Sequence, residues 1–171
     1  MDDESLEPKL RVIARKVRLF LEPHWWCWRM YEGRPEDRRL SQATCDRSSL
    51  FLVAVLTDQG LPARLAMGTP VKGPYGYCAN GSWRGHAWVE SAGHIIDLTA
   101  DQFGGPEIRI CPVNDPRYAE GEDMAEAEVI LRREETAQRL LARWRAAGGM
   151  AAPETAFAPL TEEDLRRLCE D

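Results

Sequence analysis

An uninterrupted apolar stretch, Leu50 to Leu56, limits the folds open to this chain more than any other part of its sequence. The flanking residues predict a helix from about Thr44 to Asp58, because Gly60 and Pro62 follow in positions that such residues take after helix ends. A helix that is apolar on nearly every face is buried in the middle of a domain. The sequence therefore predicts a central helix that other elements cover.

Further helices and short strands are expected around this central helix. An amphipathic helix is expected at residues 5–21, where Pro23 should end it, and residues 73–81 are expected to form a loop. Strands are expected at residues 63–67, 84–90, 94–98 and 107–111, and helices at 119–147 and directly after Thr161. The sequence thus predicts an α+β fold, with the buried helix against a mainly antiparallel sheet and peripheral helices at the C-terminus. We expect residues 1–118 to form the main domain and residues 119–171 a helical extension packed on it.

Charge and hydropathy argue against two classes of partner. A net charge of −6 on 171 residues does not fit a nucleic-acid-binding surface, which needs a basic patch. The longest apolar stretch is far shorter than the roughly 20 residues of a membrane-spanning helix. The N-terminus, Met1 to Ser5, is acidic and no hydrophobic segment follows it, so it does not resemble a secretory signal. We therefore expect a protein that binds neither nucleic acid nor membrane.

The five cysteines, at positions 27, 45, 78, 111 and 169, are widely spaced and odd in number. They lack the paired spacing of zinc ligands, so we expect no metal, and no motif indicates another cofactor. Cys27, Cys111 and Cys169 are expected to be small buried side chains, as unpaired cysteines commonly are. This pattern favours the reducing environment of the cytoplasm.

Cys45, His86 and Asp97 stand at positions that suit nucleophilic chemistry. Cys45 lies at the start of the central helix, where the helix dipole favours the thiolate, the reactive form of this side chain. His86 and Asp97 lie on two successive expected strands. A cysteine, a histidine that serves as its base and a carboxylate that orients the histidine form a catalytic triad for attack on an amide or ester. Asp101 is the alternative acid and Cys78 the alternative thiol.

The hairpin expected at residues 84–98 decides whether the histidine and the aspartate can meet. A two-residue turn at residues 92–93 pairs the strands in an even register. Because side chains alternate between the two faces of a strand, His86 and Asp97 then share one face as diagonal neighbours. A turn with one more residue would move Asp97 to the opposite face. The predicted triad therefore depends on the even turn.

The tetrahedral intermediate of such a reaction needs hydrogen-bond donors for its oxyanion. The backbone N–H of Cys45 is the first candidate, and Gln42 or a tryptophan indole, such as that of Trp26, is the second. Aromatic side chains are frequent in the walls of concave sites. The candidates for the wall of a substrate groove are Tyr77, Trp83 and Trp88.

Four segments, at residues 45–49, 60–68, 85–90 and 96–99, carry a resemblance to a known family. Cys45 opens the central helix, Gly60-Leu61-Pro62-Ala63-Arg64 leads into a strand, Gly85-His86-Ala87-Trp88-Val89-Glu90 contains the histidine, and Ile96-Asp97-Leu98-Thr99 contains the aspartate. In this order they resemble the transglutaminase-like branch of the papain-like cysteine enzymes. The chain departs from the family pattern in having Ala43 where glycine is frequent, Asp46 where an aromatic residue is frequent, and Leu98 in place of a proline.

The resemblance implies a papain-like, transglutaminase-like catalytic domain at residues 1–118, with Cys45 as nucleophile, His86 as base and Asp97 as acid. It implies a cysteine peptidase or amidase that hydrolyses a peptide or amide bond through a thioester. The small size also resembles the leader peptidases of lasso-peptide biosynthesis, which cut a leader from a precursor peptide. A small leader-recognition protein would then be a partner. Two alternatives stay open: an acyltransferase such as a transglutaminase, in which an amine resolves the thioester, and a non-catalytic peptide-binding domain that keeps the fold.

Overall fold

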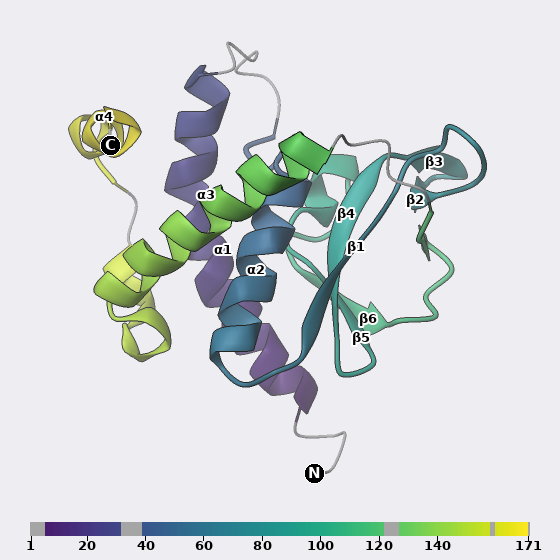
Figure 1. Cartoon of the computed structure of the whole chain (residues 1–171), viewed down its shortest axis with the longest axis horizontal. Coiled ribbons are helices and arrows are strands. Elements are labelled where there is room, and N and C mark those ends of the chain that lie inside the picture. Colours follow the sequence, from purple (N-terminus) through teal and green to yellow (C-terminus); the bar gives the residue numbers. More distant parts are fainter. Residues whose placement is uncertain (1–5, 32–38, 122–126, 158–159, 171) are drawn as a thin grey trace.

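The computed structural model describes residues 6–31, 39–121, 127–157 and 160–170, which form an α+β fold (Figure 1). The helices are α1 (Leu6–Tyr31), α2 (Cys45–Asp58), α3 (Ala127–Ala146) and α4 (Glu162–Glu170), with short 3-10 helices η2 (Ala100–Phe103), η3 (Gly149–Ala151) and η4 (Glu154–Phe157). The strands are β1 (Ala63–Gly68), β2 (Gly76–Ala79), β3 (Ser82–Arg84), β4 (His86–Ser91), β5 (His94–Asp97), β6 (Arg109–Pro112) and β7 (Tyr118–Ala119).

The strands form two antiparallel sheets. One is four-stranded, in the order β1-β4-β5-β6, and the other is three-stranded, in the order β3-β2-β7. Helix α2 packs against β1 and β4 and also contacts α1 and α3 (Figure 1). The predicted class, with a central helix against an antiparallel sheet, is confirmed.

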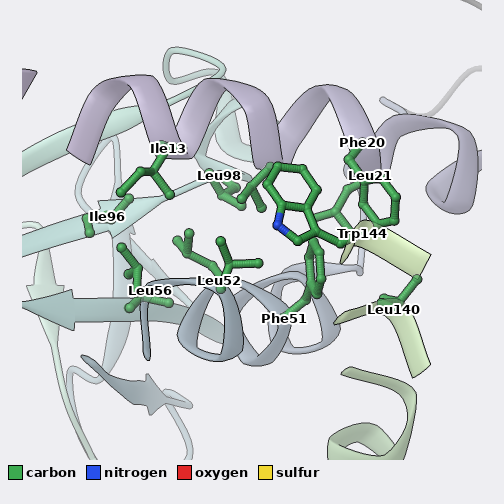
Figure 2. Close-up of a cluster of buried hydrophobic side chains, with 14 of the residues drawn as sticks. Ile13, Phe20, Leu21, Phe51, Leu52, Leu56, Ile96, Leu98, Leu140 and Trp144 are labelled. Atoms are coloured by element: carbon green, nitrogen blue, oxygen red, sulfur yellow. The ribbon is translucent and has the colours of Figure 1, made fainter. Parts of the chain in front are cut away.

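The core of the molecule is built around α2. Its side chains at Phe51, Leu52, Val55 and Leu56 are fully buried. Figure 2 shows Leu52 and Leu56 close to Ile13 of α1 and Ile96 of β5, within the same cluster of buried side chains. Each buried side chain of this size stabilises the fold by about 1.5–3 kcal/mol. The burial on three sides accounts for the apolar character of this helix.

The C-terminal extension shares this core. Leu140, Leu141 and Trp144 of α3 are buried in the same cluster, and the Trp144 ring meets Phe51 of α2 edge-on (Figure 2). One face of α2 stays half-buried at Leu50, Val53 and Ala54, where it borders α3. The described part of the helix expected at residues 119–147 is Ala127–Ala146; residues 119–121 are not helical, and residues 122–126 lie outside the described ranges.

Helix α1 is longer than expected, because the prediction that it ends at Pro23 was wrong. A proline inside a helix removes one backbone hydrogen bond and costs about 3 kcal/mol. Here Trp25 follows Pro23 and is fully buried, and its indole donates a hydrogen bond of 2.9 Å to the Ser48 hydroxyl of α2. The burial of this large side chain offsets the cost of the proline, and α1 continues to Tyr31.

The hairpin of β4 and β5 has the predicted register. Ser91 pairs with His94 and Glu90 with Ile95, so the turn consists of Ala92 and Gly93. Both turn residues have positive φ, 47° and 80°, as the type I′ turn between two twisted strands requires. The even register is therefore confirmed.

The three-stranded sheet was not predicted. Residues 73–81, expected as a loop, contain β2, which pairs with β3 across a turn at Asn80 and Gly81 and with β7 from far along the chain. The Asn-Gly pair is a strong hairpin signal that could have indicated β2 and β3. No local pattern indicates the pairing with β7.

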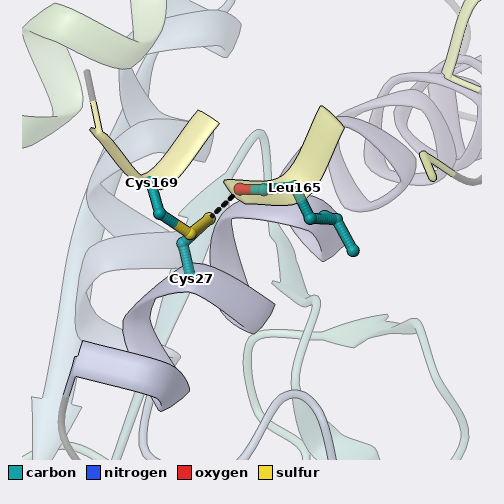
Figure 3. The surroundings of a disulfide bond; sticks show 3 residues. All are labelled: Cys27, Leu165 and Cys169. Atoms are coloured by element: carbon teal, nitrogen blue, oxygen red, sulfur yellow. Dashed lines mark hydrogen bonds between the residues drawn. A yellow bond between two sulfur atoms is a disulfide. The ribbon is translucent and has the colours of Figure 1, made fainter. Parts of the chain in front are cut away.

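A disulfide joins the first and the last of the four α-helices described. Cys27 of α1 is bonded to Cys169 of α4, with 5.3 Å between the Cα atoms, and the Cys27 sulfur also contacts the Leu165 carbonyl (Figure 3). The expectation that both are unpaired side chains was wrong, because their distance of 142 residues in sequence hides their contact in the fold. Cys111 is a buried free thiol, as expected. The disulfide gives no support for the expected cytoplasmic location, and among the described helices none is long and apolar enough to cross a bilayer.

Candidate active site

His86 and Asp97 form a buried pair at one end of the hairpin. His86 is the first residue of β4 and Asp97 the last of β5. The Nε2 atom of His86 lies 2.7 Å from Oδ2 of Asp97, and both side chains are almost completely buried. The two residues are diagonal neighbours in the even register, so the contact follows from the two-residue turn.

Asp97 is held by hydrogen bonds at both oxygens. Its Oδ1 accepts the Thr99 backbone N–H at 2.8 Å and the Thr99 hydroxyl at 3.3 Å, while Oδ2 also accepts the Tyr118 hydroxyl at 2.8 Å. Burial by itself raises the pKa of Asp97, but the charge and hydrogen bond of His86, together with these donors, lower it below its usual range. Asp97 is therefore ionised at neutral pH. Tyr118, which comes from β7, was missed by the sequence analysis.

The His86 imidazole lies between this carboxylate and the Cys45 sulfur. Burial by itself lowers the pKa of His86, but the charge and hydrogen bond of Asp97, together with those of Cys45, outweigh it and raise the pKa to about 10. Because Nε2 faces Asp97, Nδ1 is the ring nitrogen left for Cys45. The three residues that the sequence singled out thus come together in the order sulfur, imidazole, carboxylate.

Gln102 is a second residue that the sequence analysis missed. It lies in η2, with its Nε2 atom 3.3 Å from Nδ1 of His86 and donating at 3.0 Å to the Thr99 carbonyl. Its Oε1 accepts the Ala43 N–H at 3.4 Å. Gln102 therefore links the loop before Cys45 to the turn after Asp97.

Two hydrogen bonds from α2 hold the start of this helix against its neighbours. The Ser49 hydroxyl donates to the Ala87 carbonyl of β4 at 3.2 Å, and the Ser48 hydroxyl accepts the Trp25 indole N–H from α1. Because Ala87 is next to His86, the first of these bonds fixes the position of the start of α2, and so of Cys45, relative to the imidazole. The N-cap residue, Thr44, donates to the Ser41 carbonyl at 2.8 Å.

Asp101, the alternative acid, has a different role. Arg18 of α1 donates to both of its carboxylate oxygens, at 3.1 and 3.2 Å, and the Ser41 hydroxyl donates to one of them at 2.8 Å. Arg18 and Asp101 are both buried. This ion pair ties α1, η2 and the loop before α2 together, so Asp101 positions the segments that carry Gln102 and Cys45.

The loop before Cys45 contains a strained residue. Ala43 has a φ of 58°, in the left-handed region, where a Cβ atom costs roughly 1–2 kcal/mol. Glycine takes this conformation without that cost.

Cys45 and His86 line one pocket of about 510 Å³. A second pocket, of about 480 Å³, shares four lining residues with it, Gln42, Arg84, Gln102 and Phe103, so the two form one extended groove. Of the two residues considered as second oxyanion donors, Gln42 lines this groove. Trp26 instead lines a separate pocket with Met30, Tyr31, Arg166 and Cys169, so the structure does not bring it to Cys45.

The aromatic residues predicted for the groove wall lie elsewhere, and that prediction was wrong. Tyr77 and Trp88 are buried, and their rings pack around His86 with centroids 5.8 and 6.3 Å from that of the imidazole. Trp83 is half-buried on β3 and lines neither pocket. Phe103, which meets the His86 ring edge-on at 5.0 Å, is the aromatic residue that lines both. The aromatic side chains thus mainly exclude water from the histidine. Cys78, the alternative thiol, is half-buried on β2 and lines neither pocket.

Comparisons with models of protein families, with curated proteins and with solved structures found no match to this chain. The case for a function therefore comes from the residues and the geometry of this site.

Proposed function

We propose that this protein is a cysteine hydrolase that cleaves a peptide or amide bond through a thioester on Cys45. The observation that carries the proposal is the position of the His86 ring, whose Nε2 lies 2.7 Å from Asp97 and whose pKa Cys45 helps to raise, with Cys45 and His86 lining the same groove. A sulfur, an imidazole and a buried carboxylate in this order are the parts that nucleophilic catalysis by cysteine requires.

Each step of the reaction has a residue to perform it. The proton of the pair rests on His86, and the Cys45 sulfur attacks the carbonyl carbon as a thiolate to give a tetrahedral intermediate. His86 then returns its proton to the leaving amine as the C–N bond breaks, which leaves an acyl thioester. Water, deprotonated by His86, attacks the thioester and releases the acid and the free thiol. Asp97 keeps the Nε2 proton in place and stabilises the charged imidazole throughout.

The groove offers two donors for the oxyanion of the intermediate. Cys45 is the first residue of α2, where a backbone N–H has no partner within the helix and points along the dipole. The Gln42 side chain lines the same groove and supplies the second donor. Gln102 lies against His86 and the Thr99 carbonyl, which suits it to positioning the ring.

The arrangement of elements supports a papain-like fold of the transglutaminase-like branch. The cysteine begins the helix at the centre of the core, the histidine lies on β4, which packs against this helix, and the aspartate lies on the neighbouring antiparallel strand β5. The groove, extended over two adjoining pockets, has room for several residues of a peptide. We extend the proposal to a peptide or protein substrate, such as a precursor with a leader, which a small leader-recognition protein would present. A cytoplasmic location remains part of this proposal.

Turnover of peptides by matched cysteine variants tests the proposal. Wild type, Cys45→Ala and Cys78→Ala are incubated with a pool of randomised peptides in isotopically labelled water, with and without an added primary amine. We expect cleavage that incorporates the label, a loss of roughly a thousandfold or more in Cys45→Ala, and unchanged activity in Cys78→Ala.

The other outcomes separate the alternatives. Products that carry the amine in place of water would show an acyltransferase. Peptides that bind to wild type but give neither cleavage nor a thioester on Cys45 would show a binding domain and contradict the proposal.

A further inference from the structure

Arg84 occupies a central place along the groove. It is the last residue of β3, two positions before His86, and it is exposed. It lines both pockets, and the second pocket also contains the polar residues Asn80 and Ser82. Ser82 and Arg84 are alternate residues of one strand, so they present the same face of β3 to the groove.

The groove is rich in positive charge although the chain as a whole carries −6. The described residues that line the pocket around Cys45 include Arg47, Arg84 and Arg133, against a single carboxylate, Asp46. Arg133 of α3 holds that carboxylate at 2.6 Å, which neutralises both. The Arg47 guanidinium lies over the Trp28 ring, 5.1 Å from its centroid. The N-terminus of α2 adds the positive end of the helix dipole to the same pocket.

Among the described residues, Arg84 differs from Arg64 and Arg117 in having no paired carboxylate. Arg64 of β1 is paired with Glu90 and Glu120, and Arg117 is paired with Asp115. Within the described ranges, no carboxylate forms an ion pair with the Arg84 guanidinium. An exposed guanidinium without a protein partner, directed into the groove of an acidic protein, is available to a carboxylate that comes with the ligand.

We propose that Arg84 binds a substrate carboxylate, so that the groove selects peptides with an acidic group close to the bond that is cleaved. This inference rests on the proposed function and names its substrate class. The carboxylate is either that of an Asp or Glu side chain or the terminal one of the peptide. The flat, forked guanidinium recognises both through paired hydrogen bonds.

Two alkylating agents that differ in charge test the effect of Arg84 on anions. Iodoacetate and iodoacetamide both alkylate Cys45, but only iodoacetate carries a carboxylate. Their rates at Cys45 are compared at low ionic strength by peptide mass spectrometry in wild type, Arg84→Gln and Arg139→Gln. Arg139→Gln removes the same charge from an exposed position on α3 outside this groove. We expect the ratio of the iodoacetate rate to the iodoacetamide rate to fall about threefold to fivefold in Arg84→Gln and to stay constant in Arg139→Gln.

The same rates separate failure of this inference from failure of the proposed function. If neutral iodoacetamide does not prefer Cys45 over Cys78, the proposed function fails. If it does prefer Cys45 but the ratio is the same in wild type and Arg84→Gln, only the role of Arg84 is contradicted.

Peptide turnover then identifies the source of the carboxylate. A randomised pool with free C-termini and the same pool with amidated C-termini are digested by wild type, Arg84→Gln and Arg84→Glu. We expect enrichment of Asp and Glu at one position, or of free C-termini near the cleaved bond, with a loss of about tenfold or more in Arg84→Gln. Arg84→Glu should shift the preference toward Lys and Arg. A preference that is independent of residue 84 would overturn the inference.

Discussion

The His86 side chain is completely buried, and yet its pKa is raised to about 10, so the ring keeps a proton at neutral pH. Burial alone would remove this proton, and Asp97 is close enough to reverse the effect. Asp97 in turn stays ionised because the charge and hydrogen bond of His86, together with the donors Thr99 and Tyr118, lower its pKa in spite of burial. At this scale the site depends on a chain of contacts in which each group sets the charge of the next.

The protonation of His86 should make the stability of the protein depend on pH. A pKa raised from 6.5 to about 10 on folding means that the bound proton stabilises the fold fully below pH 6.5 and that this contribution is lost as pH rises through 10. For Asp97, whose pKa is lowered from 3.8, the contribution is present above pH 3.8 and is lost as pH falls further. The free energy of unfolding, measured with denaturant at pH 6, 8 and 10, should therefore decline across this range.

The two histidines of the hairpin provide the control for this measurement. In His86→Gln the decline should become much shallower, whereas His94→Gln, altered at the half-exposed start of β5, should behave as wild type. An equal decline in wild type and His86→Gln would contradict the charge assigned to His86.

At the scale of elements, the site requires the two sheets to meet closely. Gly68, at the end of β1, pairs with His86 of β4. The Tyr118 hydroxyl reaches Asp97 only because β7 lies against this end of the four-stranded sheet, where the Gly121 N–H also donates to the Met67 carbonyl at 3.1 Å. The close approach of backbones at Gly68 is what places β7.

A single methyl group at Gly68 should disturb this junction. A Cβ atom there would lie 2.5 Å from the Gly76 nitrogen and 2.6 Å from the Ala119 oxygen, and both are backbone atoms that cannot yield without moving a strand. We expect Gly68→Ala to lower the free energy of unfolding by about 2 kcal/mol or more. Chemical denaturation measures this change, and Gly85→Ala is the matched control, because its Cβ atom would make only ordinary contacts, with the Thr69 methyl at 3.5 Å and the Gly68 oxygen at 4.0 Å. Equal stability of the two variants would contradict the close junction.

At this scale, the sequence predicted those features that depend on residues close together in the chain and missed those that depend on distant residues. Helix α2 and the turn at Ala92 and Gly93 were predictable because a continuous apolar stretch and a short turn are local patterns. The approach of His86 to Asp97 could be predicted from the turn, because the number of residues in a turn fixes which residues of the two strands share a face. The contact between Tyr118 and Asp97 was not predictable, since β7 is short and pairs with a distant strand, Gly76 lying opposite Ala119, 43 residues later.

The same limit explains the errors about aromatic residues and cysteines. An alternating strand pattern shows that Trp88 is on one face of β4, but it does not show that this face is covered by Tyr118. The rings of Tyr77 and Trp88 therefore became core side chains, whereas Phe103 and Gln102, in a 3-10 helix with no periodic signal, line the groove. Cysteine spacing likewise carries no information about partners brought together by packing.

At the scale of the whole molecule, a disulfide links helix α1, early in the chain, to helix α4, late in the chain. The disulfide joins α1 to α4 across 142 residues of sequence and lies beside the pocket lined by Trp26, away from the groove around Cys45. Constraining the unfolded chain over such a distance stabilises the fold. The disulfide should therefore affect stability and leave the site unchanged.

Removal of this disulfide tests that separation. In the double variant Cys27→Ser, Cys169→Ser, we expect the free energy of unfolding to fall by about 3–5 kcal/mol, while the rate of Cys45 alkylation by iodoacetamide in the folded protein stays the same. Unfolding of wild type with and without a phosphine reductant gives an independent measure. A stability that does not respond to reduction would show that the cross-link adds nothing, and a change in Cys45 reactivity would contradict its separation from the site.

The central claim is that His86 activates Cys45, and the reactivity of Cys45 relative to Cys78 tests it most directly. Both thiols are half-buried, so exposure alone predicts similar rates. The measurement is the rate of alkylation by iodoacetamide at pH 6.5, mapped to each cysteine by mass spectrometry, in wild type, His86→Gln and His94→Gln. We predict that Cys45 reacts at least about tenfold faster than Cys78 in wild type and His94→Gln, and that this difference disappears in His86→Gln. Equal rates at the two cysteines in wild type, or a preference for Cys45 that persists in His86→Gln, would contradict the claim.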